Sequence, residues 1–340
     1  MMIVVGIDPH RQTHTAAAVD AATGRLLAEL TMTATPEGAQ RLVRWVEGLA
    51  GERLFALEDC RHVSRSLESF LVARGERLVR VPPKLMAAER RSDRRRGKSD
   101  AIDALAVARA AVREELPPAD PDPAAREIKL LLDHREDLVA ERTRFETRLR
   151  WHLHELEVGL DIPAAALSRP RWQRRLASRL AQLEQTTLVV ISREQLRRIA
   201  ELTRRARELE HKIGQLVQRH GTALLAMPGC GPLTAAKILA EAGTIGRFRS
   251  DAALALHAGV APLDASSGRQ QRHRLNRSGN RQLNCAIHRI AVTQARTYSP
   301  ARDYVARKQA EGKTRREALR CLKRHLARVI YRTLTTTPLT

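Results

Sequence analysis

The sequence predicts a mixed α/β domain at the N-terminus, two long helices in the middle and an all-α domain at the C-terminus. Short apolar runs alternate with helical patterns through residues 1–116, which is typical of α/β domains. A coiled-coil spacing of apolar residues follows within 125–220, and Ala-rich helical segments occupy 221–335. We expect these three ranges to be separate domains, with a Pro-rich linker at 117–124.

The elements of the first domain follow one another in a defined order. Strands are expected at 2–8, 14–19, 25–31, 53–57 and 77–81, and helices at 36–49, 63–73 and 99–112. The turn Ala-Thr-Gly at 22–24 separates the second and third strands, and Pro36 suits the first turn of a helix. Pro82-Pro83 stops the fifth strand. The RNase H-like (RuvC-like) fold has this order of elements: three strands, then helix, strand, helix, strand and helix.

Residues 117–123, Pro-Pro-Ala-Asp-Pro-Asp-Pro, end the first domain. Because proline lacks an amide hydrogen, we expect this segment neither to continue a helix nor to join a sheet. The helix expected at about 125–157 has a loose apolar stripe, and the second long helix repeats apolar residues at 3-4-3-4-3 spacing. That repeat consists of Ile199, Leu202, Ala206, Leu209, Ile213 and Leu216. The pattern indicates an antiparallel pair, closed by an irregular section near 160–170, and fits pairing within one chain or between two chains.

The charge of the chain favours a polyanionic partner. Lys and Arg total 60 against 38 Asp and Glu, which gives a formal net charge of +22. Most of these cations are Arg, whose planar guanidinium grips phosphate with two hydrogen bonds, so nucleic acid is the expected partner. The four cysteines form no CxxC pair and indicate neither a zinc site nor a disulfide framework. No basic leader and no apolar run of ~18 residues is present, so we expect a soluble intracellular protein without a membrane partner.

Four carboxylates are expected to meet at one edge of the sheet. Asp8 ends the first strand and Glu58 the fourth, and these strands are neighbours in the RNase H-like order. Asp100 and Asp103 share one face of the following helix. Oxygen ligands in this number favour a hard divalent cation such as Mg²⁺ (or Mn²⁺), and two such ions ~4 Å apart support phosphate chemistry. Singly, the acids could be a strand end or helix caps, and Asp59 could act in place of Glu58.

Two further segments are candidate phosphate contacts. The first is a basic run just before the acidic helix, which could also be a solvated loop. Its cations are Arg90, Arg91, Arg94, Arg95, Arg96 and Lys98. The second is Pro-Gly-Cys-Gly at 228–231, which is similar to the hairpin of helix-hairpin-helix motifs. There Gly229 and Gly231 would let backbone amides approach a phosphate, although a purely structural turn fits equally.

A Ser-Gly pair lies in an arginine-rich loop of the third domain. Ser267 precedes Gly268 and follows Ser266, which is a second candidate. An exposed serine surrounded by cations suits attack on a DNA phosphodiester, because the cations stabilise the charge that develops on the phosphate. The flanking arginines are Arg269, Arg272, Arg274, Arg277 and Arg281. Composition alone leaves Ser267 open as an ordinary loop serine.

Taken together, these motifs resemble the IS110 family of insertion-sequence transposases. The resemblance is carried by Gly-Ile-Asp-Pro-His at 6–10, Glu58, Lys-Ser-Asp-Ala-Ile-Asp-Ala at 98–104 and Pro-Gly-Cys-Gly at 228–231. It continues in Gly-Val-Ala-Pro at 259–262, Ser-Gly at 267–268 and Gly-Asn at 279–280. Glu58 is followed here by Asp-Cys, where many relatives have a small residue and then Gly.

The resemblance implies a specific activity and set of partners. A metal-binding tetrad would be Asp8, Glu58, Asp100 and Asp103, and Ser267 would form a covalent phosphoserine link to DNA. Family members are implied to be bacterial cytoplasmic, nucleoid-associated proteins that act on donor and target DNA. They form homo-oligomers (dimers or tetramers), in which the RuvC-like domain of one subunit pairs with the C-terminal domain of another. A structured RNA from the element is implied to guide them.

Three other function classes compete with this prediction. A metal-dependent RNase H-like endonuclease or junction resolvase would need the four acids but no serine. Sugar kinases and actin-like ATPases also begin with a strand that ends in Asp, but they need a second Gly-rich phosphate turn that this sequence lacks. A regulatory nucleic-acid-binding protein with an inactive site would have lost catalytic residues, and all five candidates are present here.

Overall fold

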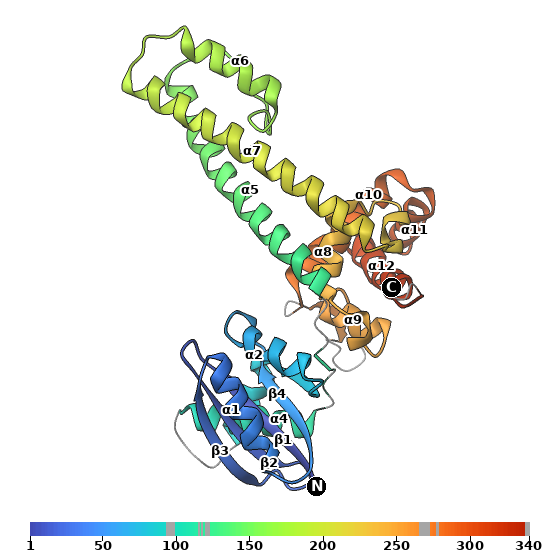
Figure 1. The fold of residues 1–340 in the computed structure, drawn as a ribbon. Coiled ribbons are helices and arrows are strands. Elements are labelled where there is room, and N and C mark those ends of the chain that lie inside the picture. The colour runs from blue at the N-terminus through green and yellow to red at the C-terminus, as the bar shows by residue number, and fades with distance from the viewer. Residues whose placement is uncertain are drawn as a thin grey trace. The chain divides into compact units, whose positions relative to one another are not determined.

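The structure, a computed structural model of the whole chain, describes residues 1–92, 99–114, 116, 118–119, 123–264, 273–276 and 279–336. It divides into two compact units, Met1–Pro121 and Asp122–Thr340 (Figure 1). Within the described ranges, no helix is both long and apolar enough to cross a bilayer.

The first unit is built on one five-stranded sheet. Its strands are β1 (Met2–Pro9), β2 (Thr13–Asp20), β3 (Leu26–Thr33), β4 (Glu52–Glu58) and β5 (Leu78–Val81). Their order in the sheet is β3-β2-β1-β4-β5. The first three strands are antiparallel, whereas β4 runs parallel to both β1 and β5. This strand order confirms the predicted RNase H-like fold.

Helices cover both faces of this sheet. Successive side chains of a strand point to opposite faces, so β1 is apolar on both of its sides. On one face Ile3 and Val5 pack into a core with helices α1 (Pro36–Glu47) and α2 (Arg61–Ala73). On the other face Val4 packs against helix α4 (Asp100–Arg113), which follows α3 (Pro83–Ser92). Asp8 shares the face of Val4, so it lies on the side that α4 covers.

Strand β5 ends at Val81, directly before Pro82-Pro83, which confirms that prediction. Pro83 also begins helix α3, which the sequence pattern did not predict; proline is well suited to a first helical turn, where its missing amide hydrogen costs nothing. The prediction that 117–123 joins no sheet is wrong at Ala119, whose amide donates to the Leu78 carbonyl at 2.7 Å. The adjacent Pro118 forms an isolated bridge with Val79. The segment can pair because Ala119 retains its amide hydrogen between the prolines.

The second unit begins with a long antiparallel helix pair, α5 (Pro123–Glu155) and α7 (Thr187–Arg219) (Figure 1). The pairing lies within one chain. Four of the six residues of the apolar repeat are buried, namely Ile199, Leu202, Ala206 and Ile213. At one end of the pair, helix α6 (Pro170–Ala181), which the sequence pattern did not predict, closes a small separate core through Leu176 and Leu180.

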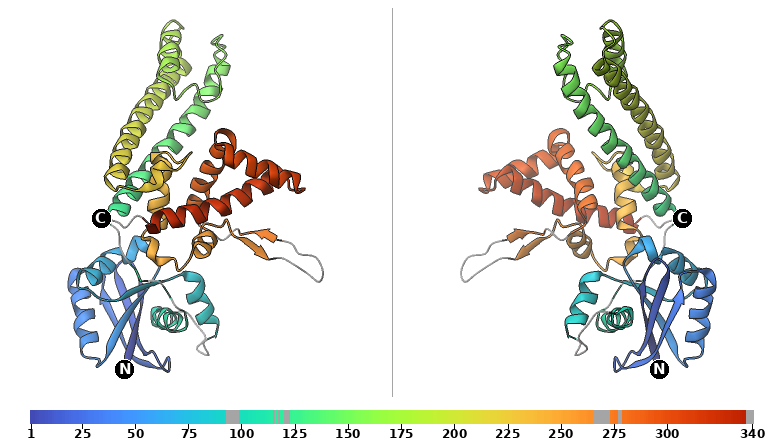
Figure 2. Two further views of the ribbon diagram at one scale, coloured as in Figure 1. Left: turned by 90° about the vertical axis from the view of Figure 1, so that its right-hand side faces the viewer. Right: turned by 90° about the vertical axis from the view of Figure 1, so that its left-hand side faces the viewer.

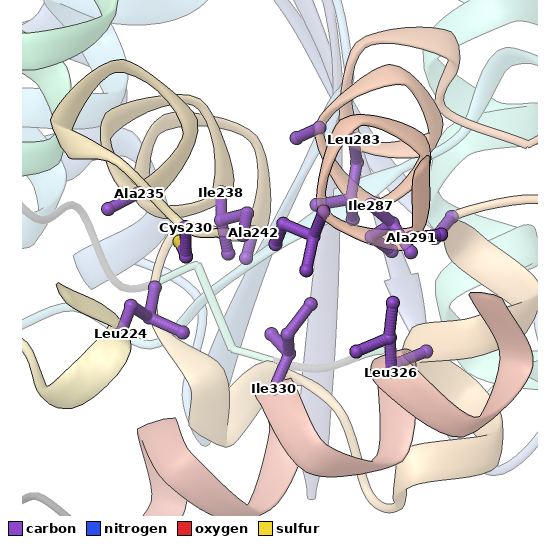
Figure 3. Packing of buried hydrophobic residues seen from close by; sticks show 14 of the residues in the cluster. Leu224, Cys230, Ala235, Ile238, Ala242, Leu283, Ile287, Ala291, Leu326 and Ile330 are labelled. Carbon is purple, nitrogen blue, oxygen red and sulfur yellow. The ribbon is translucent and has the colours of Figure 1, made fainter. Parts of the chain in front are cut away.

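The other end of the pair packs into the C-terminal helices. These elements are η1 (Ala223–Ala226), α8 (Pro232–Ala242), η2 (Ile245–Arg247), α9 (Asp251–His257), α10 (Arg281–Thr297), α11 (Ser299–Ala310) and α12 (Arg315–Thr336). Figure 3 shows Ile238 of α8, Ile287 of α10 and Leu326 of α12 meeting in their core. The same core includes Ile128 of α5 and Ile213 of α7. The spacer and the C-terminal helices therefore form one packed unit.

A two-stranded ribbon interrupts this helical region. Strand β6 (Pro262–Asp264) pairs antiparallel with β7 (His273–Leu275), and Figure 2 shows the two strands standing out from the helices of the unit. The sequence pattern did not predict these strands, because three residues are too few for an alternating pattern to appear. The chain segment between them contains Ser266 and Ser267, which lie outside the described residues.

Candidate metal centre

The sheet and one helix bring the predicted acids together. The parallel register pairs Ile7 of β1 with Leu57 of β4, so Asp8 and Glu58 follow side by side at the same sheet edge. Helix α4 begins there, with Asp100 and Asp103 in its first turn and the Ser99 hydroxyl accepting a hydrogen bond from the Ile102 amide.

Gly6 determines how closely α4 approaches the acids on the sheet. A Cβ atom at this position would lie 2.3 Å from the Ala104 carbonyl oxygen and 2.3 Å from the Ala108 amide nitrogen. Both are backbone atoms of α4, so only glycine allows the helix to pack directly on β1. Asp103 immediately precedes Ala104, and this contact therefore holds Asp103 beside Asp8, two residues beyond Gly6.

The four acids differ in their exposure. Asp8 is only 3% exposed and Asp103 6%, whereas Glu58 is half-buried and Asp100 exposed. The buried Oδ2 atom of Asp8 has no hydrogen-bond partner among the described residues. The cluster thus runs from a buried carboxylate outward to an exposed one, and the innermost oxygen accepts no hydrogen bond from the described residues.

The charges of the other three acids act on the pKa of Asp8. Burial is the largest cause that raises the pKa of Asp8, to about 6, and His10 partly opposes it. The negative charges of Glu58, Asp103 and Asp100 raise this pKa further. Glu58 is among the charges that act on Asp8, whereas its neighbour Asp59 is not. A cation bound among these groups would offset the cost of burying the charged Asp8 carboxylate and would reduce the repulsion among the acids.

His10 belongs to this cluster, although its position in the sequence predicted no role for it. Its Nε2 atom lies 3.3 Å from Asp8 Oδ2 and 3.2 Å from Asp100 Oδ1. The possible ligand atoms of these three residues all lie within 4.8 Å of one another. The only signal in the sequence was the position of His10 two residues after Asp8 in the Gly-Ile-Asp-Pro-His motif.

Of the basic run before α4, only the first part is described. Arg90 lies on α3, and its Nη1 atom donates to Asp103 Oδ1 at 2.9 Å. Arg90 thus forms an ion pair with an acid of the cluster. Arg91 is the penultimate residue of α3. The remaining cations of the run, Arg94, Arg95, Arg96 and Lys98, lie outside the described residues.

The candidate contacts of the C-terminal region are only partly described. Arg274 is exposed on β7, and Arg281 is exposed as the first residue of α10. Ser267 and the arginines Arg269, Arg272 and Arg277 lie outside the described ranges. The structure therefore gives positions for two of the five arginines that flank the Ser-Gly pair.

The two glycines of the 228–231 turn have different surroundings. Gly229 has a φ of +78°, and a Cβ atom there would lie 3.1 Å from Thr293 Cβ of α10. The Pro228 carbonyl accepts a hydrogen bond from Gln294 Nε2 at 2.7 Å. Gly231 is exposed at the N-terminus of α8, and apart from its chain neighbours no atom of the described residues lies within 4 Å of a Cβ built there. Gly229 thus serves helix packing, and Gly231 leaves space in front of α8.

Solved structures of similar fold include RuvC of Thermus thermophilus. One such structure is 22% identical to this chain, with a TM-score of 0.28, and the match covers 35% of this chain and all of RuvC. A structure of T. thermophilus RuvC in complex with a Holliday junction substrate matches with a TM-score of 0.26. The fold is established by the strand order of the sheet and not by these likenesses.

Sequence comparisons identify the family. One model, described as "Transposase" of the DEDD IS110 type, matches residues 5–157, and a second, "Transposase IS116/IS110/IS902 family", matches 221–306. Proteins of the insertion elements IS116 of Streptomyces clavuligerus and IS900 of Mycobacterium paratuberculosis are each 29% identical. These two matches cover 97% and 96% of this chain and 94% of each relative. The pilin gene-inverting protein of Moraxella bovis is 31% identical over 36% of this chain and 41% of its own length. The chain therefore belongs to the IS110 family of transposases, enzymes that cut and rejoin DNA.

Proposed function

We propose that this transposase cuts and rejoins the DNA of an insertion sequence with a divalent metal centre and a serine nucleophile. The metal ligands are Asp8, Glu58, Asp100 and Asp103, and the nucleophile is Ser267. The observation that carries the metal centre is the buried Oδ2 atom of Asp8, which accepts no hydrogen bond from the described residues, contacts His10 Nε2 at 3.3 Å and lies near three further carboxylates. Such a group is costly to bury unless a cation compensates it.

The residues present fit Mg²⁺ or Mn²⁺. These ions prefer carboxylate oxygens, and all four proposed ligands are carboxylates. When bound, a divalent ion stabilises negative charge on the oxygens of a reacting phosphodiester. The chain's own part is to hold the acids in place through the β1–β4 register and the contact between Gly6 and α4. His10, between Asp8 and Asp100, orients both carboxylates.

The proposed covalent step follows from the chemistry of a serine hydroxyl. The Oγ atom of Ser267 forms a bond to phosphorus, and the bond from phosphorus to one bridging oxygen breaks. The proton leaves Oγ, and the departing strand end takes up a proton to become an alcohol. A hydroxyl of another strand then reverses these steps, which joins the new strand and frees the serine. The surrounding arginines stabilise the charge on phosphate in both directions. They are Arg269, Arg272, Arg274, Arg277 and Arg281.

Membership of the family supports the remaining proposals. A structured RNA of the element pairs with donor and target DNA, and the net charge of +22 suits a chain that binds both nucleic acids. The proposed domains are the RuvC-like domain at 1–116, the linker at 117–124, the spacer at 125–220 and the C-terminal domain at 221–335. In a homo-oligomer, the RuvC-like domain of one subunit and the serine-bearing domain of another complete one active site.

The pair Ser267→Ala and Ser266→Ala tests the nucleophile, each serving as the control for the other. The protein is purified with its co-expressed element RNA and incubated with donor DNA and Mg²⁺, and protein–DNA adducts are separated on a denaturing gel. We expect Ser267→Ala to lose both the adduct and strand cleavage, and Ser266→Ala to retain both. Normal cleavage by Ser267→Ala would indicate a metal-dependent endonuclease or resolvase without a serine step. Sequencing the RNA that co-purifies tests the proposed guide.

A further inference from the structure

Helices α10 and α12 each present a stripe of polar and basic residues to one cavity. On α10 the stripe is Arg281, Cys285 and His288, and on α12 it is Arg316, Arg320 and Lys323. Both stripes have the spacing i, i+4, i+7, which places their members on one face of a helix. The cavity between them has a volume of ≈ 730 Å³.

The opposite faces of the same helices fix this arrangement. Leu283 and Ile287 of α10 and Leu322 and Leu326 of α12 are buried in the core of the second unit. Figure 3 shows Leu283, Ile287 and Leu326 pointing into this core. Because the core holds both helices, the two basic stripes face the cavity from a rigid frame and do not depend on a loop.

The cavity concentrates positive charge, and the nearby Glu317, which does not line it, interacts electrostatically with Arg320. No carboxylate is among the described residues that line it, and its four cations form no ion pair with the described acids. Lys323 is half-buried, and its Nζ atom donates to the neutral Asn284 side chain. Burial and the nearby Arg320 lower the pKa of Lys323, and burial and Lys323 lower the pKa of His288. Cations held this close together repel one another, and a bound anion would reduce that repulsion.

The cavity adjoins the base of the β6–β7 ribbon. Asn276 and Gly279, which follow β7, line it. Gly279 packs so tightly that a Cβ atom there would lie 2.3 Å from Gly259 Cα. Arg320 and Lys323 also line a second cavity, of ≈ 780 Å³, together with Pro262 of β6 and Arg274 of β7. The second cavity contains Glu311 and Glu317 as well, so the first is the better anion site.

We propose that the cavity between α10 and α12 binds a phosphate of the DNA backbone and holds that strand at the base of the ribbon. Guanidinium and ammonium groups converging from two helices suit the oxygens of a phosphodiester, which Arg contacts with paired hydrogen bonds. The inference rests on the proposed function in one respect, namely that the ribbon carries the serine that attacks this DNA.

The test compares two double variants of the full chain by fluorescence anisotropy with a labelled DNA duplex, in EDTA. Arg316→Gln/Arg320→Gln removes two cations of the cavity. Arg289→Gln/Arg332→Gln removes two exposed cations from the same helices outside it. We expect the first variant to bind DNA about tenfold more weakly than the control, and its salt slope to fall by about 0.9 for each lost phosphate contact. An equal loss in both variants would show a diffuse charge effect and overturn the proposal.

Two further measurements keep the test decisive. Lys323→Met removes a half-buried cation without a carboxylate partner, so we expect weaker DNA binding and no fall in the thermal midpoint. A lower midpoint with unchanged DNA binding would instead make Lys323 structural and contradict the site.

The second measurement replaces the DNA duplex by an RNA hairpin. The variant Arg316→Gln/Arg320→Gln should then bind as tightly as the control Arg289→Gln/Arg332→Gln, and a loss of binding confined to RNA would refute the proposal for DNA. Because EDTA prevents cleavage, the result does not depend on whether Ser267 forms an adduct.

Discussion

Replacing Gly6 by Ala tests how the fold assembles the acidic cluster. The added Cβ atom would lie 2.3 Å from the Ala104 carbonyl oxygen and 2.7 Å from Ala108 Cα, where ordinary contacts begin at 3.4 Å. Both neighbours are backbone atoms in the middle of α4, so no side chain can rotate away. The helix must move off the sheet by about 1 Å to restore an ordinary contact.

Two effects of this displacement are expected. Overpacking of a core typically costs ~1–3 kcal/mol, which in a domain of this size lowers the thermal midpoint by roughly 3–15 °C. The movement also carries Asp100 and Asp103 away from Asp8, which β1 holds in the sheet. Since a misplacement of 1 Å can reduce a reaction rate by about 100-fold, we expect a loss of cleavage of that order.

Gly48→Ala is the matched control. Gly48 ends α1 with a φ of −72°, and a Cβ atom there would come no closer than 3.4 Å to a neighbour. Thermal melts of both variants, with and without Mg²⁺, and DNA cleavage rates give the comparison. We expect Gly48→Ala to match the wild type in both assays, and Gly6→Ala to lose cleavage together with most of its stabilisation by Mg²⁺. Wild-type cleavage by a fully folded Gly6→Ala protein would refute the role of this contact.

Two other predictions concern single carboxylates. Asp8→Asn and Asp103→Asn should abolish cleavage yet leave DNA binding intact, because each removes a proposed metal ligand and no cation. A gel shift and a cleavage assay on one preparation would show this. Loss of DNA binding by a folded variant would contradict it. In the second unit, burial raises the pKa of Glu241, but hydrogen bonds from Lys129 and Asn280 outweigh burial and hold it below the ordinary 4.5. Ionised Glu241 therefore stabilises the fold above pH 4.5, and this contribution is lost as the pH falls through the lowered pKa. Thermal midpoints of Glu241→Gln should accordingly fall less steeply on acidification than those of the wild type, and parallel curves would argue against this.

The arrangement of the acids could be predicted because it depends on chain order and strand ends. Apolar runs located β1 and β4 to within a residue or two, and parallel neighbours place their ends at one edge. Asp100 and Asp103 followed from helical spacing alone. Local patterns determine these features, and the structure brings all four acids close enough for three of them to act on the pKa of Asp8.

Residues whose role arises only from tertiary packing escaped prediction. His10 reaches Asp100 because a tight turn, closed by the hydrogen bond from its amide to the Thr13 carbonyl, folds it over the sheet edge. In the sequence it is one exposed histidine, ninety residues from its second partner. The basic stripes of α10 and α12 likewise look like ordinary solvated helix faces. Only the packing of the two helices turns the stripes toward each other, and no single-helix pattern contains that information.

His10 and Arg90 lie beside the acids that gather at this edge of the sheet. Each lies at the rim of the cluster, where its side chain remains 51% and 34% exposed, and each contacts one buried acid. Neither donates a hydrogen bond to the innermost atom, Asp8 Oδ2. Arg90 reduces the repulsion among the acids, and His10 does so when it is protonated, while Asp8 Oδ2 accepts no hydrogen bond from the described residues and can take a ligand. A cluster neutralised completely by its own side chains would be more stable, but it would attract a divalent ion only weakly.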